Sequence, residues 1–99
     1  MFEIFVTRGA EQELRSFPPR VRRMLVEAME RLLTVEPLTP TRNRKPLRPL
    51  RAPWSTMPPV WELRVDQYRI FYDAVPEDRR VFVRAIRRKP PHRTTEDIL

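Results

Sequence analysis

Residues 61–74 read WELRVDQYRIFYDA, and this stretch decides how the rest of the chain can fold. Its aromatic and branched residues recur at every second position on both sides of Asp66 and Gln67, which predicts a β-hairpin with those two residues as its turn. In that register Arg64 stands directly opposite Arg69. Like charges that face each other across two strands destabilise the pair by up to about 1 kcal/mol. The hairpin therefore raises the question of what holds two arginines together.

Patterns on either side of the hairpin extend this prediction to a sheet and two helices. Phe2–Val6 alternates and predicts a first strand, after which Thr7 can cap a short helix over Ala10–Phe17. Apolar residues at helical spacing predict a second, longer helix over Arg20–Val35. Apolar residues on both faces of Arg80–Arg87 predict a strand in the middle of the sheet.

These elements predict one α+β domain over residues 1–99, with the order β-α-α-β-β-β. An amphipathic helix buries its apolar stripe against a sheet, so the helical hairpin is expected to cover one face of a mainly antiparallel sheet. The last three strands form a meander, which the first strand is expected to join. The other sheet face is then expected to be concave and wet. After the last strand, Thr94–Asp97 resembles a helix N-terminal box.

The segment 37–59 has a different composition from the rest of the chain. It holds seven of the twelve prolines and no acidic residue, and proline at this density disfavours a helix or a central strand. Its basic residues are Arg42, Arg44, Lys45, Arg48 and Arg51. Long loops in compact domains are usually functional or mobile. We therefore predict a Pro/Arg-rich loop that either contacts a ligand or has no fixed role.

The charge balance narrows the classes of function. Twenty Lys and Arg residues stand against 13 Asp and Glu residues, which gives a net charge of +7. This excess favours a polyanionic partner (nucleic acid, an acidic protein or a membrane surface), although small domains are also basic for solubility alone. The chain has no cysteine, one histidine and one glycine, which argues against a zinc site and a Gly-rich phosphate loop. Side chains, mainly arginine, must then hold any phosphate.

The sequence gives no sign of membrane insertion or export. The start, MFEIFVTRG, lacks the basic region and long apolar stretch of a secretory signal. No apolar run approaches the roughly 20 residues that span a bilayer. A cytoplasmic protein that uses no metal or other cofactor is the expectation.

Three basic clusters are expected to border one surface. They are the loop segment 42–51, the hairpin pair Arg64 and Arg69, and the segment 87–93 at the end of the last strand. An anion between the paired arginines would turn their repulsion into a clamp, because guanidinium binds phosphate oxygens in a forked geometry.

Other interpretations of the arginine pair stay open. The register can be shifted by one residue, or Glu62 or Asp73 on the same face can neutralise the two charges. His92 is similarly ambiguous, because a lone histidine is most often a surface residue with no role. The four cations around it favour a neutral imidazole, which can accept or donate a proton beside phosphate-binding arginines.

Two segments together carry a resemblance to a known family: WELRVDQYRIFYDA at 61–74 and VFVRAIRRKPPHRTTEDIL at 81–99. With the KPLR segment at 45–48 and a helical hairpin after the first strand, they resemble the RelE/ParE superfamily of toxins from type II toxin–antitoxin systems. The resemblance covers nearly the whole chain and implies the RelE-like fold. For the RelE-like branch it implies a ribosome-dependent mRNA endoribonuclease that inhibits translation. Such enzymes need no metal and leave a 2′,3′-cyclic phosphate and a 5′-hydroxyl.

The resemblance also implies roles for individual residues. Arg69, in the YR pair of the hairpin, would bind the scissile phosphate and stabilise the transition state. The basic residue after the last strand matches Arg88 or Lys89, and we count Arg88 among the catalytic candidates. Glu62 and His92 are the candidates for acid–base work. The residues expected to bind RNA are Lys45, Arg48, Arg64, Arg87, Lys89 and Arg93.

The sequence departs from the family pattern at two places. RelE proper carries lysines on the strand where this chain has Trp61 and Glu62, whereas other branches use a glutamate and a histidine. The C-terminal tyrosine of several members has no match at Thr94 or Thr95. Two alternatives therefore stay open. One is a ParE-like toxin that inhibits DNA gyrase without nuclease chemistry, and the other is a non-catalytic RNA- or ribosome-binding relic of the fold.

The resemblance implies partners as well. A cognate antitoxin with an acidic segment would cover the basic face, and the ribosome with its mRNA would be the target. The chain alone is expected to be monomeric and to form a larger assembly with the antitoxin.

Overall fold

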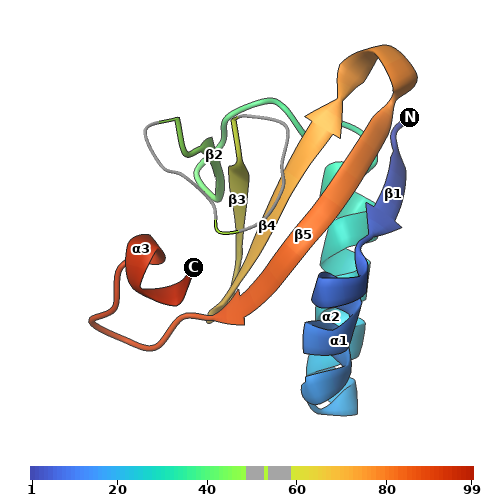
Figure 1. Cartoon of the computed structure of the whole chain (residues 1–99). Coiled ribbons are helices and arrows are strands. Elements are labelled where there is room, and N and C mark those ends of the chain that lie inside the picture. Colours follow the sequence, from blue (N-terminus) through green and yellow to red (C-terminus); the bar gives the residue numbers. More distant parts are fainter. Residues whose placement is uncertain (49–52, 54–58) are drawn as a thin grey trace.

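The computed structural model describes residues 1–48, 53 and 59–99 (Figure 1). The loop prediction for 49–52 and 54–58, which includes Arg51, lies outside the described residues. In chain order the elements are β1 (Glu3–Val6), α1 (Arg8–Ser16), α2 (Pro19–Leu33), β2 (Arg44–Pro46), β3 (Trp61–Val65), β4 (Tyr68–Val75), the 3₁₀ turn η1 (Pro76–Asp78), β5 (Arg80–Arg88) and α3 (Thr95–Ile98). The α+β prediction is confirmed, and the structure adds the short strand β2.

The strands form one mixed sheet in the order β1-β5-β4-β3-β2 (Figure 1). Strand β1 runs parallel to β5, and every other neighbouring pair is antiparallel. Strand β5 therefore lies inside the sheet, as its apolar pattern predicts. Strand β2 occupies an edge, the position in which a strand tolerates a proline such as Pro46.

The hairpin has the predicted register. Arg64 pairs with Arg69 and Val65 with Tyr68, so Asp66 and Gln67 form the turn. Asp66 takes a left-handed backbone conformation with φ of 54°, which Asp and Asn tolerate better than most residues.

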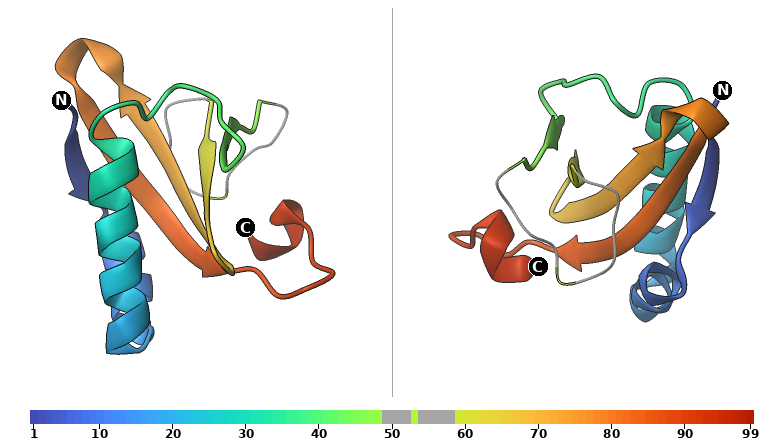
Figure 2. Two further views of the ribbon diagram at one scale, coloured as in Figure 1. Left: turned by 180° about the vertical axis from the view of Figure 1, so that it is seen from behind. Right: turned by 45° about the horizontal axis from the view of Figure 1, so that its top comes forward.

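Helices α1 and α2 cover one face of the sheet (Figure 2). The Thr7 side chain caps α1 by accepting from the Ala10 amide, as predicted, and Pro19 opens α2 in the first turn, where it breaks no hydrogen bond. Their apolar stripes pack on the sheet in a core that includes Leu25, Met29, Leu63, Ile70, Tyr72, Val81 and Val83. No helix in the described residues is long and apolar enough to cross a membrane.

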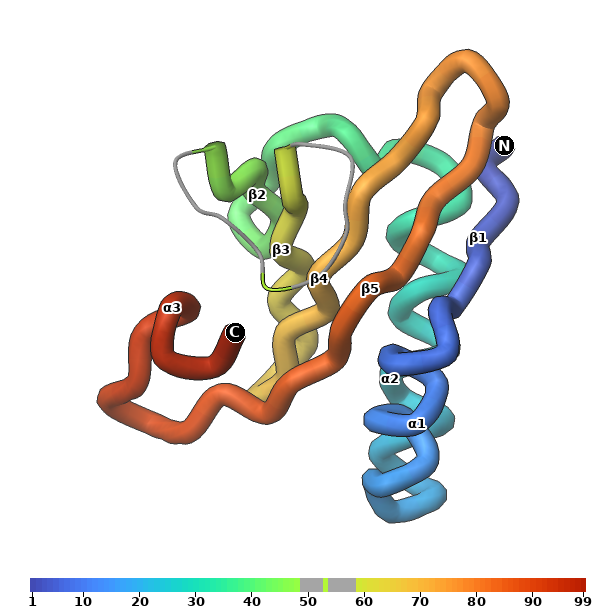
Figure 3. Tube along the Cα trace, in the orientation of Figure 1, coloured from blue at the N-terminus to red at the C-terminus, as the bar shows by residue number. Residues whose placement is uncertain are grey.

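The opposite face of the sheet is expected from the sequence to be concave and wet, and the structure agrees only in part: the face holds a polar pocket, but the C-terminal tail covers some of it. Figure 3 shows the chain leaving β5, turning outward and returning toward β3. This return brings Ile98 and Leu99 onto a small apolar cluster of Val60, Phe71 and Ala85. The sequence predicts the start of α3, but its pattern cannot say that the tail folds back. What stays open on this face is a polar pocket beside the tail.

Candidate functional site

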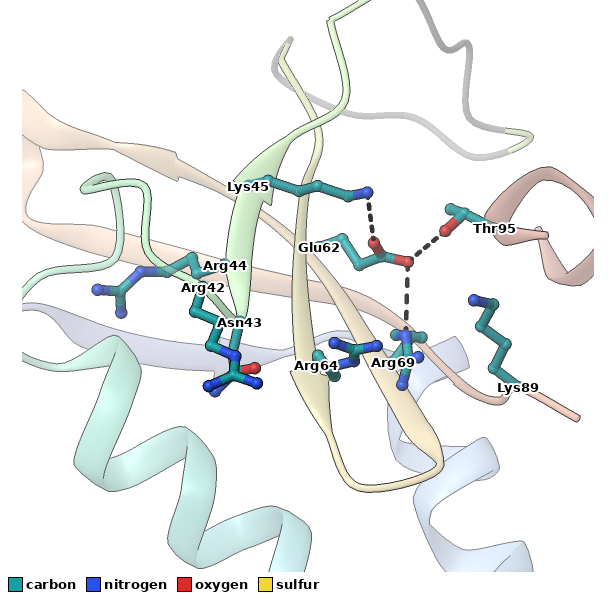
Figure 4. Close-up of a pocket in the computed structure, with 9 residues that line it drawn as sticks. All are labelled: Arg42, Asn43, Arg44, Lys45, Glu62, Arg64, Arg69, Lys89 and Thr95. Carbon is teal, nitrogen blue, oxygen red and sulfur yellow. Dashed lines mark hydrogen bonds and ion pairs between the residues drawn. The ribbon is translucent and has the colours of Figure 1, made fainter. Parts of the chain in front are cut away.

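A pocket of about 130 Å³ lies on the sheet face opposite α1 and α2 (Figure 4). Strand β2 and the turn before it form one wall, the β3–β4 hairpin forms the floor, and the segment after β5 forms the other wall. The lining residues are Arg42, Asn43, Arg44, Lys45, Glu62, Arg64, Arg69, Lys89 and Thr95. One carboxylate therefore stands among six basic residues, which makes the pocket attractive to an anion.

Glu62 is the centre of the pocket. It lies on β3 with 5% of its surface exposed, and its carboxylate contacts three side chains (Figure 4). The Thr95 hydroxyl donates a hydrogen bond to Oε2 at 2.7 Å. Lys45 Nζ lies 3.8 Å from Oε1, and Arg69 Nε lies 3.9 Å from Oε2. The two cations neutralise Glu62 but stand beyond hydrogen-bonding distance, so neither pair is closed.

Arg69 is held in place by the turn of its own hairpin. Its Nη1 donates to the carbonyl oxygens of Asp66 at 3.0 Å and Tyr68 at 2.9 Å. Burial lowers the pKa of Arg69, the Glu62 carboxylate opposes this effect, and the Arg64 charge adds to it. The guanidinium stays protonated at physiological pH because arginine does so throughout proteins. The side of Arg69 that faces Glu62 is thus a fixed, partly desolvated positive charge.

The pocket explains in part how Arg64 and Arg69 can face each other across the hairpin. Glu62 neutralises Arg69, which is one of the alternatives left open by the sequence. Arg64 stays exposed across from it, with its backbone amide bonded to the Asn43 carbonyl at 2.7 Å. The described structure gives Arg64 no carboxylate within ion-pair distance. An anion in the pocket would supply the missing charge.

Two neighbouring basic residues on β2, Arg44 and Lys45, point to opposite faces of the sheet and make different contacts. Arg44 is 6% exposed, and its guanidinium donates to the Leu32 and Thr39 carbonyl oxygens, both at 2.8 Å. It thereby satisfies a carbonyl at the end of α2 and fixes the start of the loop. Lys45 points to the other face and keeps an exposed ammonium over Glu62. Strand alternation turns the Arg44 guanidinium toward the end of α2, although Arg44 also lines the pocket, and it places the Lys45 ammonium over Glu62.

Of the basic residues at the end of β5 and just after it, Lys89 lines the pocket. Arg88 lies outside it, where its Nη2 donates to Gln67 Oε1 at 3.2 Å. Arg87 also lies outside, and it joins three elements. Its Nε donates to the Ile98 carbonyl at 2.9 Å, and it forms an ion pair with Glu13 of α1. The burial that goes with these contacts lowers the pKa of Arg87.

The remaining candidates from the sequence are on the surface. His92 is exposed and does not line the pocket, and its φ of 68° is unusual for a residue other than glycine. The turn around it is closed by the Arg93 amide, which donates to the Pro90 carbonyl at 3.3 Å. Arg93 and Arg48 are exposed and also lie outside the pocket lining. The structure therefore assembles five of the ten candidates: Lys45, Glu62, Arg64, Arg69 and Lys89.

The sequence pattern assigns no role to two residues of the pocket wall, Asn43 and Thr95. Thr95 could be found only as part of a helix start, since nothing in the pattern shows where the tail docks. Asn43 has no signal beyond its place between two arginines. Across 1–48, 53 and 59–99, no group of three or more His, Cys, Asp or Glu residues could hold a metal ion.

Comparison with known proteins gives matches among solved structures alone, because no family model and no curated protein sequence matches the chain. The toxin–antitoxin complex RelBE2 from Mycobacterium tuberculosis is 26% identical with a TM-score of 0.70, over 89% of this chain and 98% of that one. The archaeal RelE–RelB complex from Pyrococcus horikoshii is 18% identical with a TM-score of 0.69, over 94% and 98%. The isolated RelE toxin of E. coli is 20% identical with a TM-score of 0.66, over 97% and 90%. The chain thus has the RelE-like fold over almost its full length.

Proposed function

We propose that this chain, with its RelE-like fold, is the toxin of a type II toxin–antitoxin module and cleaves mRNA on the ribosome. One observation carries the proposal. A buried carboxylate, Glu62, stands between Lys45 and Arg69 in a cationic pocket, with both ion pairs open at 3.8 and 3.9 Å. Such an arrangement suits a carboxylate that exchanges partners when a phosphate enters.

A substrate phosphate binds Arg69 in place of Glu62, and Lys45 and Lys89 add positive charge around it. The freed Glu62 carboxylate accepts the proton of the ribose 2′-hydroxyl, whose oxygen attacks the adjacent phosphorus. The bond from phosphorus to the 5′-oxygen breaks, and that oxygen takes a proton from Lys89 or water. The products are a 2′,3′-cyclic phosphate and a free 5′-hydroxyl.

Arg69 would supply the largest share of the rate. Charge develops on the phosphorane oxygens in the transition state, and a fixed donor that is already desolvated stabilises it without reorganising. The two turn carbonyls that bind Nη1 hold Arg69 in this orientation before the substrate arrives. His92 has no part in this scheme, because it is exposed outside the pocket.

A partner follows from the same likeness. Two of the similar structures are complexes of a toxin with its antitoxin. We propose that a cognate antitoxin covers the basic pocket of this chain, and that the free toxin acts in the cytoplasm on translating ribosomes.

The test is to add the purified protein to a translating extract and to map new 5′-hydroxyl ends on the mRNA. We expect cuts at ribosome-occupied codons with the wild type and none with Arg69→Ala. Arg23→Ala, an exposed arginine on α2, is the matched control and should cut normally. Lys89→Ala should cut more slowly than Arg88→Ala if the pocket residue is the one that acts. A folded wild-type protein that leaves the mRNA intact would reject the nuclease proposal and direct attention to gyrase inhibition and plain RNA binding.

A further inference from the structure

The hydrogen bond between Thr95 and Glu62 joins the C-terminal tail to the centre of the pocket. We infer that Thr95 is a positioning residue, whose hydroxyl holds the Glu62 carboxylate in the orientation that accepts the 2′-proton. This inference rests on the proposed nuclease function. It concerns the first residue of α3, which belongs to the tail and not to the hairpin that carries Glu62 and Arg69.

The geometry shows what the hydroxyl does. Thr95 Oγ1 donates to Glu62 Oε2 at 2.7 Å, while Arg69 Nε stands 3.9 Å from the same oxygen. A carboxylate beside a guanidinium tends to form a closed, two-bond pair. Thr95 competes for Oε2 and so keeps the carboxylate from closing onto Arg69. Arg69 then stays available for a phosphate, and Oε1 stays available for a proton.

The position of Thr95 is built by several independent contacts. In the capping box of α3, the Thr94 hydroxyl accepts from the Asp97 amide at 3.2 Å, and the Thr94 amide donates to Asp97 Oδ2 at 3.1 Å. Arg87 holds the Ile98 carbonyl at 2.9 Å. Ile98 and Leu99 pack on the apolar cluster beside the pocket. The hydroxyl therefore meets Glu62 because the whole tail is docked.

Rigid support of this kind matters for a general base. A glutamate has three rotatable side-chain bonds, and misplacing a reacting group by about 1 Å can cost on the order of 100-fold in rate. The nearly complete burial of Glu62 leaves little water to orient it. A hydroxyl that only donates to the carboxylate can fix the orientation without removing its charge.

Two substitutions of Thr95 separate positioning from packing. Thr95→Val keeps the shape and removes the hydroxyl, whereas Thr95→Ser keeps the hydroxyl. In a single-turnover cleavage assay on ribosomes, we expect Thr95→Val to slow cleavage about 10- to 100-fold. We expect Thr95→Ser to stay within about threefold of the wild type, since its hydroxyl can still be correctly placed. Affinity for mRNA with a 2′-deoxy group at the cleavage site should be unchanged in both.

A double-variant cycle gives the control. In a Glu62→Gln background the carboxylate is gone, so adding Thr95→Val should slow cleavage no further. The inference is overturned if Thr95→Val cuts like the wild type, if Thr95→Ser is as slow as Thr95→Val, or if the loss lies in RNA affinity. A further slowing in the Glu62→Gln background would also overturn it.

An RNA-free measurement distinguishes failure of this inference from failure of the proposed function. The side-chain carboxyl carbon resonance of Glu62 should shift in Thr95→Val and stay in place in Thr95→Ser. An unchanged resonance in Thr95→Val rejects the contact whatever the activity. If the resonance shifts but the wild-type protein does not cut mRNA, the hydrogen bond between Thr95 and Glu62 exists. The positioning role in cleavage is then rejected together with the nuclease proposal.

Discussion

Two acid–arginine pairs lie on the same face of the sheet, and they differ in how tightly they close. Asp73 is fully buried and bonds Arg84 through both oxygens, to Nε at 2.8 Å and to Nη2 at 3.1 Å. Glu62 is almost as buried, yet its arginine, Arg69, stands 3.9 Å away. Both pairs join the same chemical groups on neighbouring strands.

The difference indicates which pair is structural. Arg84 has its charge neutralised in a two-bond pair and its guanidinium over the Phe82 ring, 4.9 Å from the centroid. Arg84 therefore has little charge or hydrogen-bonding capacity left for a ligand. Arg69 is oriented by carbonyls, but its charge faces a carboxylate that Lys45 and Thr95 also contact. The open ion pair beside the pocket therefore favours Arg69 over Arg84 as the arginine that would bind an anion.

The largest expected effect is that of Arg69→Lys on the rate of the proposed mRNA cleavage. Lysine keeps the charge but cannot donate to the turn carbonyls and a phosphate in the same forked geometry. We expect cleavage on the ribosome to slow by about 100- to 1000-fold, the usual loss for one transition-state donor. Single-turnover kinetics measure it. If Arg69→Lys and the wild type cut at equal rates, a positive charge at position 69 is sufficient. The open geometry of the Glu62–Arg69 pair would then not mark a functional arginine.

The complementary variant is Arg84→Met, which should act on stability. It leaves the fully buried Asp73 without its two-bond partner, and breaking a buried pair from one side costs about 3 kcal/mol. Urea unfolding at neutral pH measures this loss. The folded fraction should still cleave at close to the wild-type rate, because Arg84 does not line the pocket. If Arg84→Met is as stable as the wild type but no longer cleaves mRNA, Arg84 acts in cleavage and the Asp73–Arg84 pair is not the structural one.

The sequence predicts the hairpin well because its physical cause is local. Period-two alternation and two turn residues fix the register, and the register alone places Arg64 against Arg69. The helices follow in the same way from their apolar stripes. Strand β2 is missed because only three residues pair and they lie among prolines. Its partner on β3 is far along the chain, so no local pattern marks it.

The site is predictable only in part, for the same reason. Strand alternation on the hairpin gives Glu62, Arg64 and Arg69, which the structure brings to one pocket. For Arg44, charge suggests a ligand contact while the structure uses it to hold the Leu32 carbonyl. Nothing in the sequence reveals that α2 ends next to it. The role of Thr95 depends on a returning tail, and tertiary contacts of that kind leave no pattern.

A smaller effect is expected from His92→Gly, which tests whether this histidine is structural or catalytic. His92 has a φ of 68°, and the left-handed region costs a residue with a Cβ about 1–2 kcal/mol relative to glycine. We expect the variant to keep its cleavage rate and to be as stable as the wild type or slightly more so. Thermal unfolding and the cleavage assay measure both quantities. Cleavage reduced 100-fold in a stably folded His92→Gly would return His92 to the catalytic residues.

The smallest effect concerns the pH at which the tail stays docked. A hydrogen bond from the Thr94 amide is the main reason that the pKa of Asp97 lies below its usual value of 3.8, and the Thr94 hydroxyl and Arg93 add to the effect. A group whose pKa is lower in the folded state stabilises that state above the unfolded pKa, and this stabilisation is lost as pH falls through the folded pKa. The capping box should therefore hold α3 at every pH above about 4 and weaken below it. Amide chemical shifts of Asp97 and Thr94, followed from pH 6 to 2, report the transition, which Asp97→Asn should abolish. A midpoint at or above 3.8 would mean that the box does not hold the tail, and the support for Thr95 would then come from Arg87, Ile98 and Leu99 alone.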